Sequence, residues 1–286
     1  MVVAKWKLKA RSRLPSFGIS LCVLLFLLLI LVPFYWLFVS SLTPRHLIFQ
    51  TPPDYFPRLT VENFVNLINQ VPFLAYLRNS VLFSLGSSVF SVLVSFLAAY
   101  AFARINAPGK NLLLLCLVLS MALPEISTVV PLFQILRNMK MINTVRGLIL
   151  VMTSVLVPFT VWVLVSFIKR VPVELEEAAM VDGVNNVLKL LWYVVIPVMG
   201  PALVTMLVIN FITAWNNLLY PLIFSSTPAA KTLSVSITEV FQARTPYGRP
   251  WELISALGVT MVLPVIILVF ISQRAIVSGL TRGSLN

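Results

Sequence analysis

Charged side chains are scarce in this 286-residue chain, where they make up 10% of the residues, against roughly 25% in a typical soluble domain. Hydrophobic residues make up 59%. A chain with so few charged groups cannot cover a globular fold with water-compatible surface. The composition therefore excludes an ordinary soluble protein and predicts an all-α protein that crosses a membrane several times.

Cysteine and histidine are nearly absent too. Cys22 and Cys116 lie inside apolar runs, and the single histidine, His46, follows the first such run. These residues offer neither a disulfide framework nor the spacing of metal ligands. The chain also lacks a G-x-x-x-x-G-K-[ST] phosphate loop. We therefore expect no catalytic residue, no metal site and no cofactor bound by this chain.

The formal net charge of +12 is high, but the positions of the basic residues argue against a nucleic-acid partner. They lie between apolar runs rather than on one face or in one tail, as expected when charge sets membrane topology. Membrane lipid is the partner that the charge pattern and the apolar runs together predict.

Six charge-poor runs are long enough for the about 20 residues that a membrane-spanning helix needs. Their cores lie near 18–40, 78–104, 110–136, 146–169, 193–215 and 252–274. The sequence thus predicts a cytoplasmic segment, 1–17, followed by one six-helix transmembrane domain, 18–286. Glu125 interrupts the third run directly after Pro124, so we expect a kink there.

Five basic residues precede the first run and place the N-terminus in the cytoplasm by the positive-inside rule: Lys5, Lys7, Lys9, Arg11 and Arg13. This run is too long for the core of a cleaved signal peptide. Six crossings return the C-terminus to the cytoplasm and leave two external loops, 41–77 and 219–251. Their prolines and aromatics predict an irregular outer surface, which could receive a partner or simply cap the bundle.

The polar segment 170–192 lies between the fourth and fifth runs. Pro172 is suited to the start of a helix, the acidic residues that follow suit its first turn, and Gly183 suits its end. Asn185 or Asn186 can cap a second short helix. The residues that we expect to contact another protein lie in the first short helix and at its end: Glu176, Glu177, Ala178, Ala179, Asp182 and Gly183.

This short helix is acidic and rich in alanine. A helix lying on lipid headgroups would instead have a basic polar face and large apolar residues opposite it. Small alanine side chains allow a close approach to another backbone. We therefore favour docking into a groove of a cytoplasmic protein over lying on the membrane.

The sequence Glu177-Ala178-Ala179, followed three residues later by Gly183, resembles the EAA loop of importer permeases of the ATP-binding cassette (ABC) class. The resemblance implies that this helix is the coupling helix, which sits in a cleft of a cytoplasmic ATPase subunit. One departure is visible. Pro197 follows Gly183 by fourteen residues, where the family usually has thirteen, and this puts the register of the second short helix in doubt.

Further segments resemble carbohydrate permeases of this class, and together with the EAA loop the likeness covers nearly the whole chain. They are residues 41–57, 60–64, 78–80, 98–104 and 214–216. Residues 279–284 resemble the tail of the smaller permease subunit of maltose transporters. That likeness implies that Thr281, Arg282 and Gly283 reach the interface of the ATPase dimer.

Two groups within the spans are candidates for a substrate path. Glu125 is the one ionisable residue placed inside a run, so it should face the bundle interior or water. The alternatives are a bond to backbone freed by the prolines, or a position nearer the outer interface. Trp215, Asn216 and Asn217 could stack on and hydrogen-bond to a sugar. An interfacial tryptophan followed by capping asparagines explains them equally well.

The resemblance implies a permease subunit of an ATP-driven carbohydrate importer in the inner membrane. Its partners would be an ABC ATPase dimer, which binds ATP and magnesium, a second related permease and an extracytoplasmic sugar-binding protein. The same machinery could carry a glycerol phosphate or a polyol instead. A secondary transporter fits less well, because it needs paired intramembrane charges. A membrane scaffold without transport activity is the remaining alternative.

Overall fold

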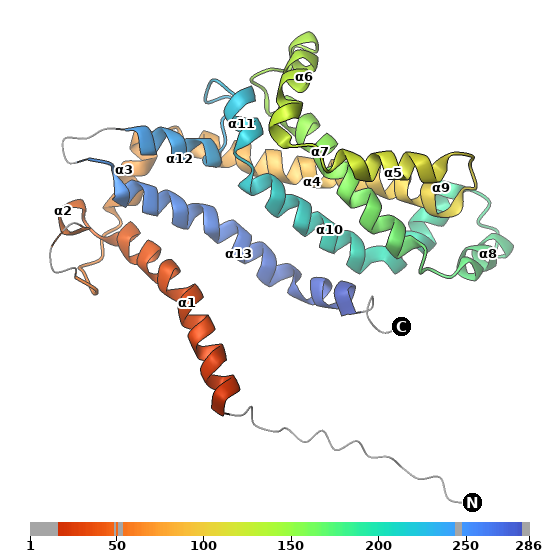
Figure 1. Ribbon diagram of the computed structural model, residues 1–286, viewed down its shortest axis with the longest axis horizontal. Coiled ribbons are helices and arrows are strands. Elements are labelled where there is room, and N and C mark those ends of the chain that lie inside the picture. Colours follow the sequence, from red (N-terminus) through yellow and green to blue (C-terminus); the bar gives the residue numbers. More distant parts are fainter. Residues whose placement is uncertain (1–16, 49, 51–53, 244–247, 282–286) are drawn as a thin grey trace, which may run out of the picture.

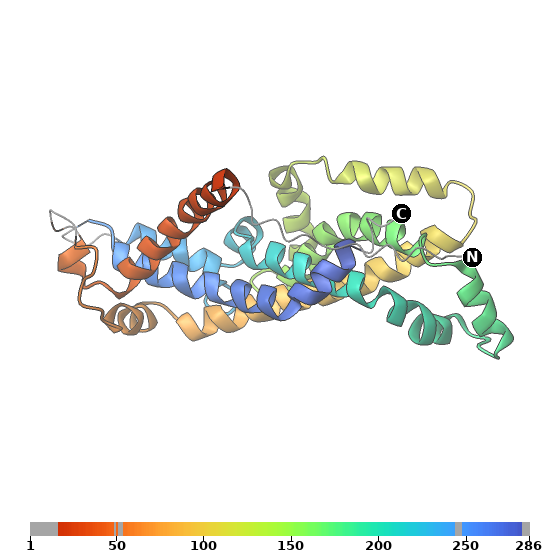
Figure 2. The same ribbon diagram turned by 90° about the horizontal axis from the view of Figure 1, so that it is seen from below.

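The computed structural model describes residues 17–48, 50, 54–243 and 248–281, and within them the elements are helices. They form an elongated bundle (Figures 1 and 2). Four long helices follow its long axis: α4 (Phe73–Arg104), α7 (Val145–Ile168), α10 (Ile196–Asn216) and α13 (Trp251–Thr281). The short helix α8 (Val173–Val181) lies at one end of the bundle, and α3 (Glu62–Gln70) and α12 (Leu233–Gln242) lie at the other.

Five of the described helical runs are long and apolar enough to span a membrane. They are Gly18–Leu42, Phe73–Arg104, Val145–Ile168, Val187–Asn216 and Trp251–Gln273. Each overlaps almost completely with one of the apolar cores found in the sequence, because a bilayer interior selects for length and hydropathy, and both can be read along the chain. The structure thus confirms the all-α polytopic fold.

The third predicted run is broken rather than kinked. Helices α5 (Lys110–Ser120) and α6 (Glu125–Asn138) meet at 104°, and α6 projects from the side of the bundle (Figure 1). The break has a local cause. The N–H groups of Met121, Ala122 and Leu123 turn back to carbonyls three residues earlier, and Pro124 then caps α6 without an N–H of its own. The pair counts as a sixth span only if both halves are taken together.

The bundle core forms around α4, which packs most extensively on α7 and α10. One side of α4 is lined by buried serines: Ser80, Ser84, Ser87, Ser88, Ser91 and Ser95. Small side chains allow helix backbones in a membrane to approach closely. Asn210 on α10 joins the three helices, because its amide donates to Ser91 Oγ at 2.8 Å and to Thr160 Oγ1 at 2.9 Å.

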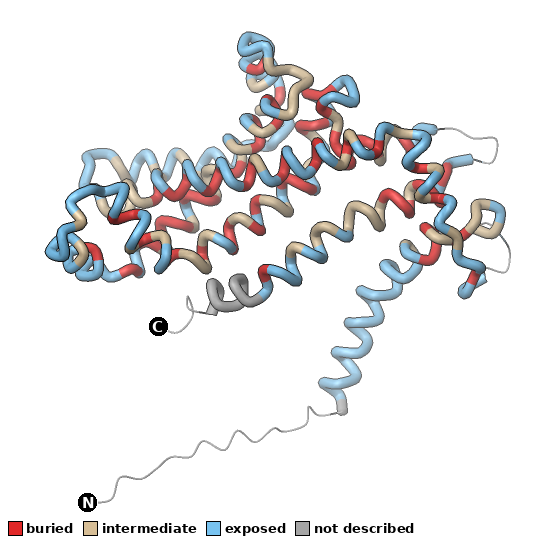
Figure 3. Tube along the Cα trace, turned by 180° about the vertical axis from the view of Figure 1, so that it is seen from behind, coloured by how far each residue is buried: buried red, intermediate tan, exposed pale blue. Residues whose placement is uncertain are grey.

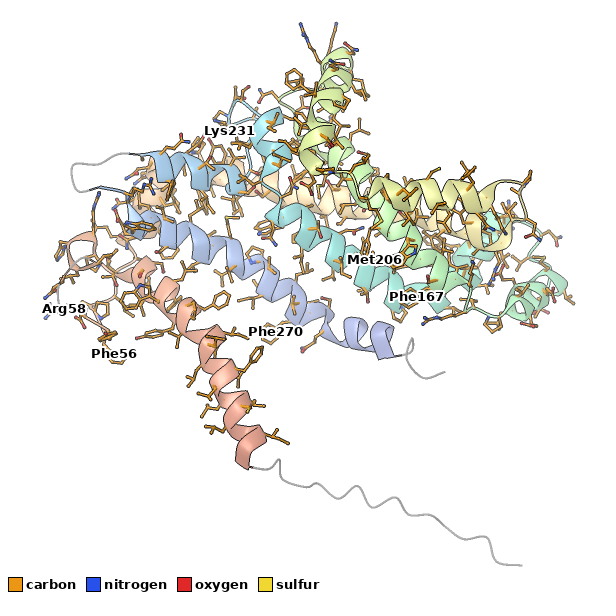
Figure 4. All side chains as sticks on the ribbon, viewed as in Figure 1. Phe56, Arg58, Phe167, Met206, Lys231 and Phe270 are labelled. Atoms are coloured by element: carbon orange, nitrogen blue, oxygen red, sulfur yellow. The ribbon has the colours of Figure 1, made fainter. Side chains whose placement is uncertain are left out.

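Larger apolar side chains fill the half of the core nearest α8. Met206 of α10 is 1% exposed, and Phe167 of α7 packs against the same cluster (Figure 4). Phe270 of α13, in contrast, is 67% exposed. Helix α1 (Phe17–Leu42) is exposed along most of its length (Figure 3). This continuous apolar surface is suited to lipid or to another membrane subunit.

The two predicted loops, 41–77 and 219–251, contain short helices that the sequence did not predict. The first contains α2 (Arg45–Ile48) and α3, and the second contains α11 (Leu219–Phe224) and α12. Helices α3 and α12 each bury an apolar side, with Leu67 and Leu233 in one cluster. Packing on α13 and α4 stabilises these segments, which are too short to be stable alone.

Candidate functional site

Helix α8 ends in a Schellman motif, which fixes the shape of the segment that resembles a coupling helix. Gly183 adopts a left-handed conformation with φ of +95°, as predicted for the residue that ends this helix. Its N–H donates to Met180 O at 3.1 Å, and Val184 N donates to Ala179 O at 3.0 Å. These are the two bonds of the motif. Pro172 caps the other end of the helix.

The six predicted contact residues divide into two groups. Glu177, Ala178, Asp182 and Gly183 are exposed and Ala179 is half-buried, so a partner protein could reach them. Glu176 differs, because it is 3% exposed and is the one buried residue of α8. It therefore faces the protein rather than the surface available for docking.

Glu176 is bound to the end of α4. Its Oε1 accepts from Arg104 Nε at 2.7 Å and lies 2.7 Å from Arg104 Nη2, and its Oε2 accepts from Tyr100 OH at 2.8 Å. Arg104 Nη2 also donates to Val171 O at 2.7 Å. Sequence reasoning missed this pairing. Its only signal was a charged residue at the end of an apolar span and another in a helix that starts 69 residues later.

A π-helical turn lies in the stretch between Gly183 and Pro197, where the sequence has one residue more than the usual spacing. Asn186 caps α9 (Val187–Leu190) by accepting from Leu188 N at 2.8 Å, as predicted. The turn η1 (Leu191–Val195) follows and leads into α10. An i→i+5 bond encloses one residue more than an α-helical bond. The run Val187–Asn216 therefore remains a single helix.

A cavity of about 410 Å³ lies at the break between α5 and α6. Glu125 lines it, and Thr128 and Tyr220 form a hydroxyl pair at 3.1 Å on its wall. Burial raises the pKa of Tyr220, and the Glu125 carboxylate raises it further, although the hydrogen bond to Thr128 opposes this shift. The phenol therefore stays protonated and able to donate. The wall is completed by Ser120, Met121, Leu123, Pro131, Leu132, Ser154, Val155, Pro158 and Phe159.

Trp215 does not form a sugar platform. It is 3% exposed, its Nε1 donates to Met261 O at 3.0 Å, and its ring stacks on Phe211. Asn217 accepts from Tyr220 N at 3.2 Å at the start of α11. Asn217 thus bonds at a helix start, as the alternative expected, but Trp215 lies in the core rather than at a membrane interface. Asn216 is exposed and lines a mainly apolar hollow between α1 and α13, away from Glu125.

The predicted ATPase contacts at the C-terminus are only partly described. Thr281 is the last residue of α13, and Arg282 and Gly283 lie outside the described residues. Among the described residues, no three His, Cys, Asp or Glu side chains are grouped so that they could hold a metal ion.

Asparagines fasten the segments at the end of the bundle opposite α8, and sequence reasoning assigned them no such role. Asn79 of α4 donates to Pro228 O at 2.9 Å and to Lys231 O at 3.0 Å. Asn63 of α3 donates to the carbonyls of Ser41 and Thr43 at 2.9 and 2.8 Å. Figure 4 shows Lys231 near α11 and Arg58 and Phe56 near α2. These segments are thus tied to long helices.

The chain resembles membrane components of transport systems in sequence. It is 36% identical over 257 residues to the permease protein SmoH of the sulfoquinovosyl glycerol transport system of Agrobacterium fabrum, covering 90% of this chain and 89% of that one. It is 33% identical over 267 residues to the permease protein MalG of the trehalose/maltose system of Thermococcus litoralis, covering 92% and 94%. The permease protein SugB of the trehalose system of Mycobacterium tuberculosis is 35% identical over 257 residues, with 90% and 92% covered.

Solved structures show the same fold. A chain from a bacterial ABC transporter involved in the import of alginate superposes with a TM-score of 0.78 at 21% identity, covering 90% of this chain and 95% of that one. A chain of an alginate ABC transporter in complex with a periplasmic protein that holds an alginate pentasaccharide gives a TM-score of 0.66 at 16% identity, with 89% and 91% covered.

A family model described as the binding-protein-dependent transport system inner membrane component matches residues 91–282. This range includes the Schellman-capped helix α8, its attachment to α4 at Arg104 and the cavity at Glu125. The family match, the relatives and the fold agree. The chain therefore belongs to the binding-protein-dependent transport system inner membrane component family.

Proposed function

We propose that this permease is half of the translocation pathway of an ATP-driven carbohydrate importer. A cytoplasmic ABC ATPase dimer would bind the exposed face of α8, and a second, related permease would complete the pathway. An extracytoplasmic sugar-binding protein would deliver the solute to the end of the bundle that contains α3 and α12. Both chain termini would lie in the cytoplasm.

The observation that carries this proposal is the exposed, rigidly capped face of α8. Glu177, Ala178 and Gly183 are exposed among the described residues, and α8 lies at one end of the bundle (Figure 1). A helix with small residues at its centre fits a groove closely. The sugar transport systems named for the relatives support carbohydrate as the solute class.

The cavity at Glu125 supports a neutral, hydroxyl-rich solute. It offers one carboxylate together with the hydroxyls of Thr128 and Tyr220 and the ring of Phe159. Glu125 forms no ion pair among the described residues. Its charge is therefore available to accept from sugar hydroxyls, and it would repel a phosphate. This argues against a glycerol phosphate as the solute.

Purification in mild detergent, followed by reconstitution into proteoliposomes, tests the proposal. We expect an ATPase and a second permease to co-purify with the tagged chain from its native cells. Uptake of a sugar should then require ATP and the binding protein, and it should survive collapse of ion gradients. A chain that purifies alone, or uptake that follows an ion gradient without ATP, would contradict the proposal.

Glu125→Gln should raise the half-saturating concentration for sugar entry about fivefold. The reason is that a charge-assisted hydrogen bond is about 1 kcal/mol stronger than a neutral one. Glu125→Lys should lower uptake further. The measurement is initial uptake by proteoliposomes at saturating binding protein. Ser127→Ala, on the same helix but outside the cavity lining, is the control. Equal uptake by all four proteins would remove Glu125 from the pathway.

A further inference from the structure

Helix α8 has little apolar packing to hold it in place. Its hydrophobic side chains are largely outside the core, with Val173, Leu175 and Met180 between 45% and 50% exposed and Val181 88% exposed. Among the helices, α8 packs mainly on α9 and η1, which follow it in the chain. A helix attached in this way could move relative to the rest of the bundle unless polar contacts held it in place.

Those contacts come from the end of α4. The Arg104 and Glu176 side chains are 14% and 4% exposed, and both carboxylate oxygens are occupied by Arg104 and Tyr100. Arg104 also binds the carbonyl of Val171, directly before the residue that caps α8. The first turn of α8 and the backbone leading into it are therefore both held by α4.

Helix α4 is built to transmit displacement along the bundle. Its 32 residues extend about 48 Å at the α-helical rise of 1.5 Å per residue. Among the five described single spans it alone has no proline inside; the others contain Pro33, Pro158, Pro201 and Pro264. At its far end, Tyr76 OH donates to Glu239 of α12 at 3.0 Å, and Ser80 Oγ accepts from Leu233 N at 2.8 Å.

We propose that Arg104 and Glu176 are positioning residues that join α8 to α4, so that movement of the docking helix displaces α4 and the external segments attached to it. The pair does not contact the solute or the ATPase. A buried ion pair suits this role because separating its charges, or removing one partner, leaves an uncompensated buried charge. The inference rests on the proposed function, since it requires an ATPase that moves α8.

Glu176→Gln in the reconstituted importer tests the inference. We expect at least a tenfold loss of solute transported per ATP hydrolysed, because ATP hydrolysis should continue while stimulation by the binding protein is lost. The double variant Arg104→Glu with Glu176→Arg should recover at least half of the coupling, since it restores the ion pair. Asn106→Ala, a change at an exposed residue just after the end of α4 and outside α8, should behave like the unmodified protein.

Transport and hydrolysis that fall in equal proportion in an assembled complex would overturn the inference, because the pair would then serve only to present the docking face. So would full coupling in Glu176→Gln. If that variant fails to assemble, Tyr100→Phe is the test, because it removes the hydrogen bond to Glu176 without leaving a buried charge unpaired. Reduced coupling in Tyr100→Phe supports the inference, and normal coupling refutes it. Failure of the unmodified protein to show ATP-dependent uptake would instead refute the proposed function.

Discussion

Gly183→Pro is expected to reduce ATP-driven uptake by more than tenfold while leaving the amount of protein in the membrane unchanged. Proline fixes φ near −65°, whereas this residue has φ of +95°. Proline would also remove the N–H that bonds to Met180 O. The Schellman motif would be lost, and with it the geometry of the face that we propose docks the ATPase. Uptake by proteoliposomes, normalised to inserted protein, is the measurement.

Two further glycine variants separate this effect from general damage. A Cβ at residue 183 would meet no atom within 4 Å, so Gly183→Ala adds only backbone strain of about 1 kcal/mol and should lower uptake about fivefold. Gly109 also has a left-handed φ, +78°, and open surroundings, but it precedes α5. Gly109→Pro should therefore retain most uptake. Normal uptake by Gly183→Pro would contradict the docking role of α8.

Gly147→Ala is expected to destabilise the protein by at least about 2 kcal/mol. A Cβ at this position would lie 2.3 Å from the backbone oxygen of Met141, which cannot rotate away. Relieving the overlap would displace Thr144, which caps α7 by accepting from Gly147 N at 3.0 Å. Loss of a cap costs about 1 kcal/mol, and overpacking costs about 1–3 kcal/mol.

Thermal unfolding of the detergent-solubilised protein, followed by size-exclusion chromatography, measures this effect. Gly200→Ala is the matched control, because Gly200 lies inside α10 and an added Cβ there meets nothing within 4 Å. Alanine favours helix over glycine by about 1 kcal/mol, so that variant should be as stable as the unmodified protein or more so. Equal melting temperatures for both variants would show that the turn between α6 and α7, which contains Met141, is not rigid.

The same turn between α6 and α7 supports the segment between α11 and α12, which connects its stability to the proposed function. Asn143 lies between α6 and α7, and its Oδ1 accepts from Ser226 N and Thr227 N at 3.0 Å each. Displacement of this turn would break these hydrogen bonds and release the segment between α11 and α12. We therefore expect any Gly147→Ala protein that folds to show weaker stimulation by the binding protein.

Local features of the coupling segment could be predicted because they depend on neighbours in the chain. The glycine that ends α8 and the asparagine that caps α9 act through bonds to residues within five positions. The one-residue departure before Pro197 could be seen in the sequence, but the π-turn at Leu191–Val195 could not.

By itself, the sequence determined that this protein is a helical membrane protein with an exposed, glycine-ended polar helix, because hydropathy, length and capping act over short stretches of chain. Only the tertiary structure decided which polar residues face a partner and which face the protein. Glu176 and Glu177 are adjacent in the same helix, yet one is buried against Arg104 and the other is exposed. Trp215 and Glu125 were both candidates for a substrate path, but Trp215 is buried in the core and Glu125 lines a cavity. The physical reason is that burial depends on which helices pack together, and residues far apart in the chain set that packing.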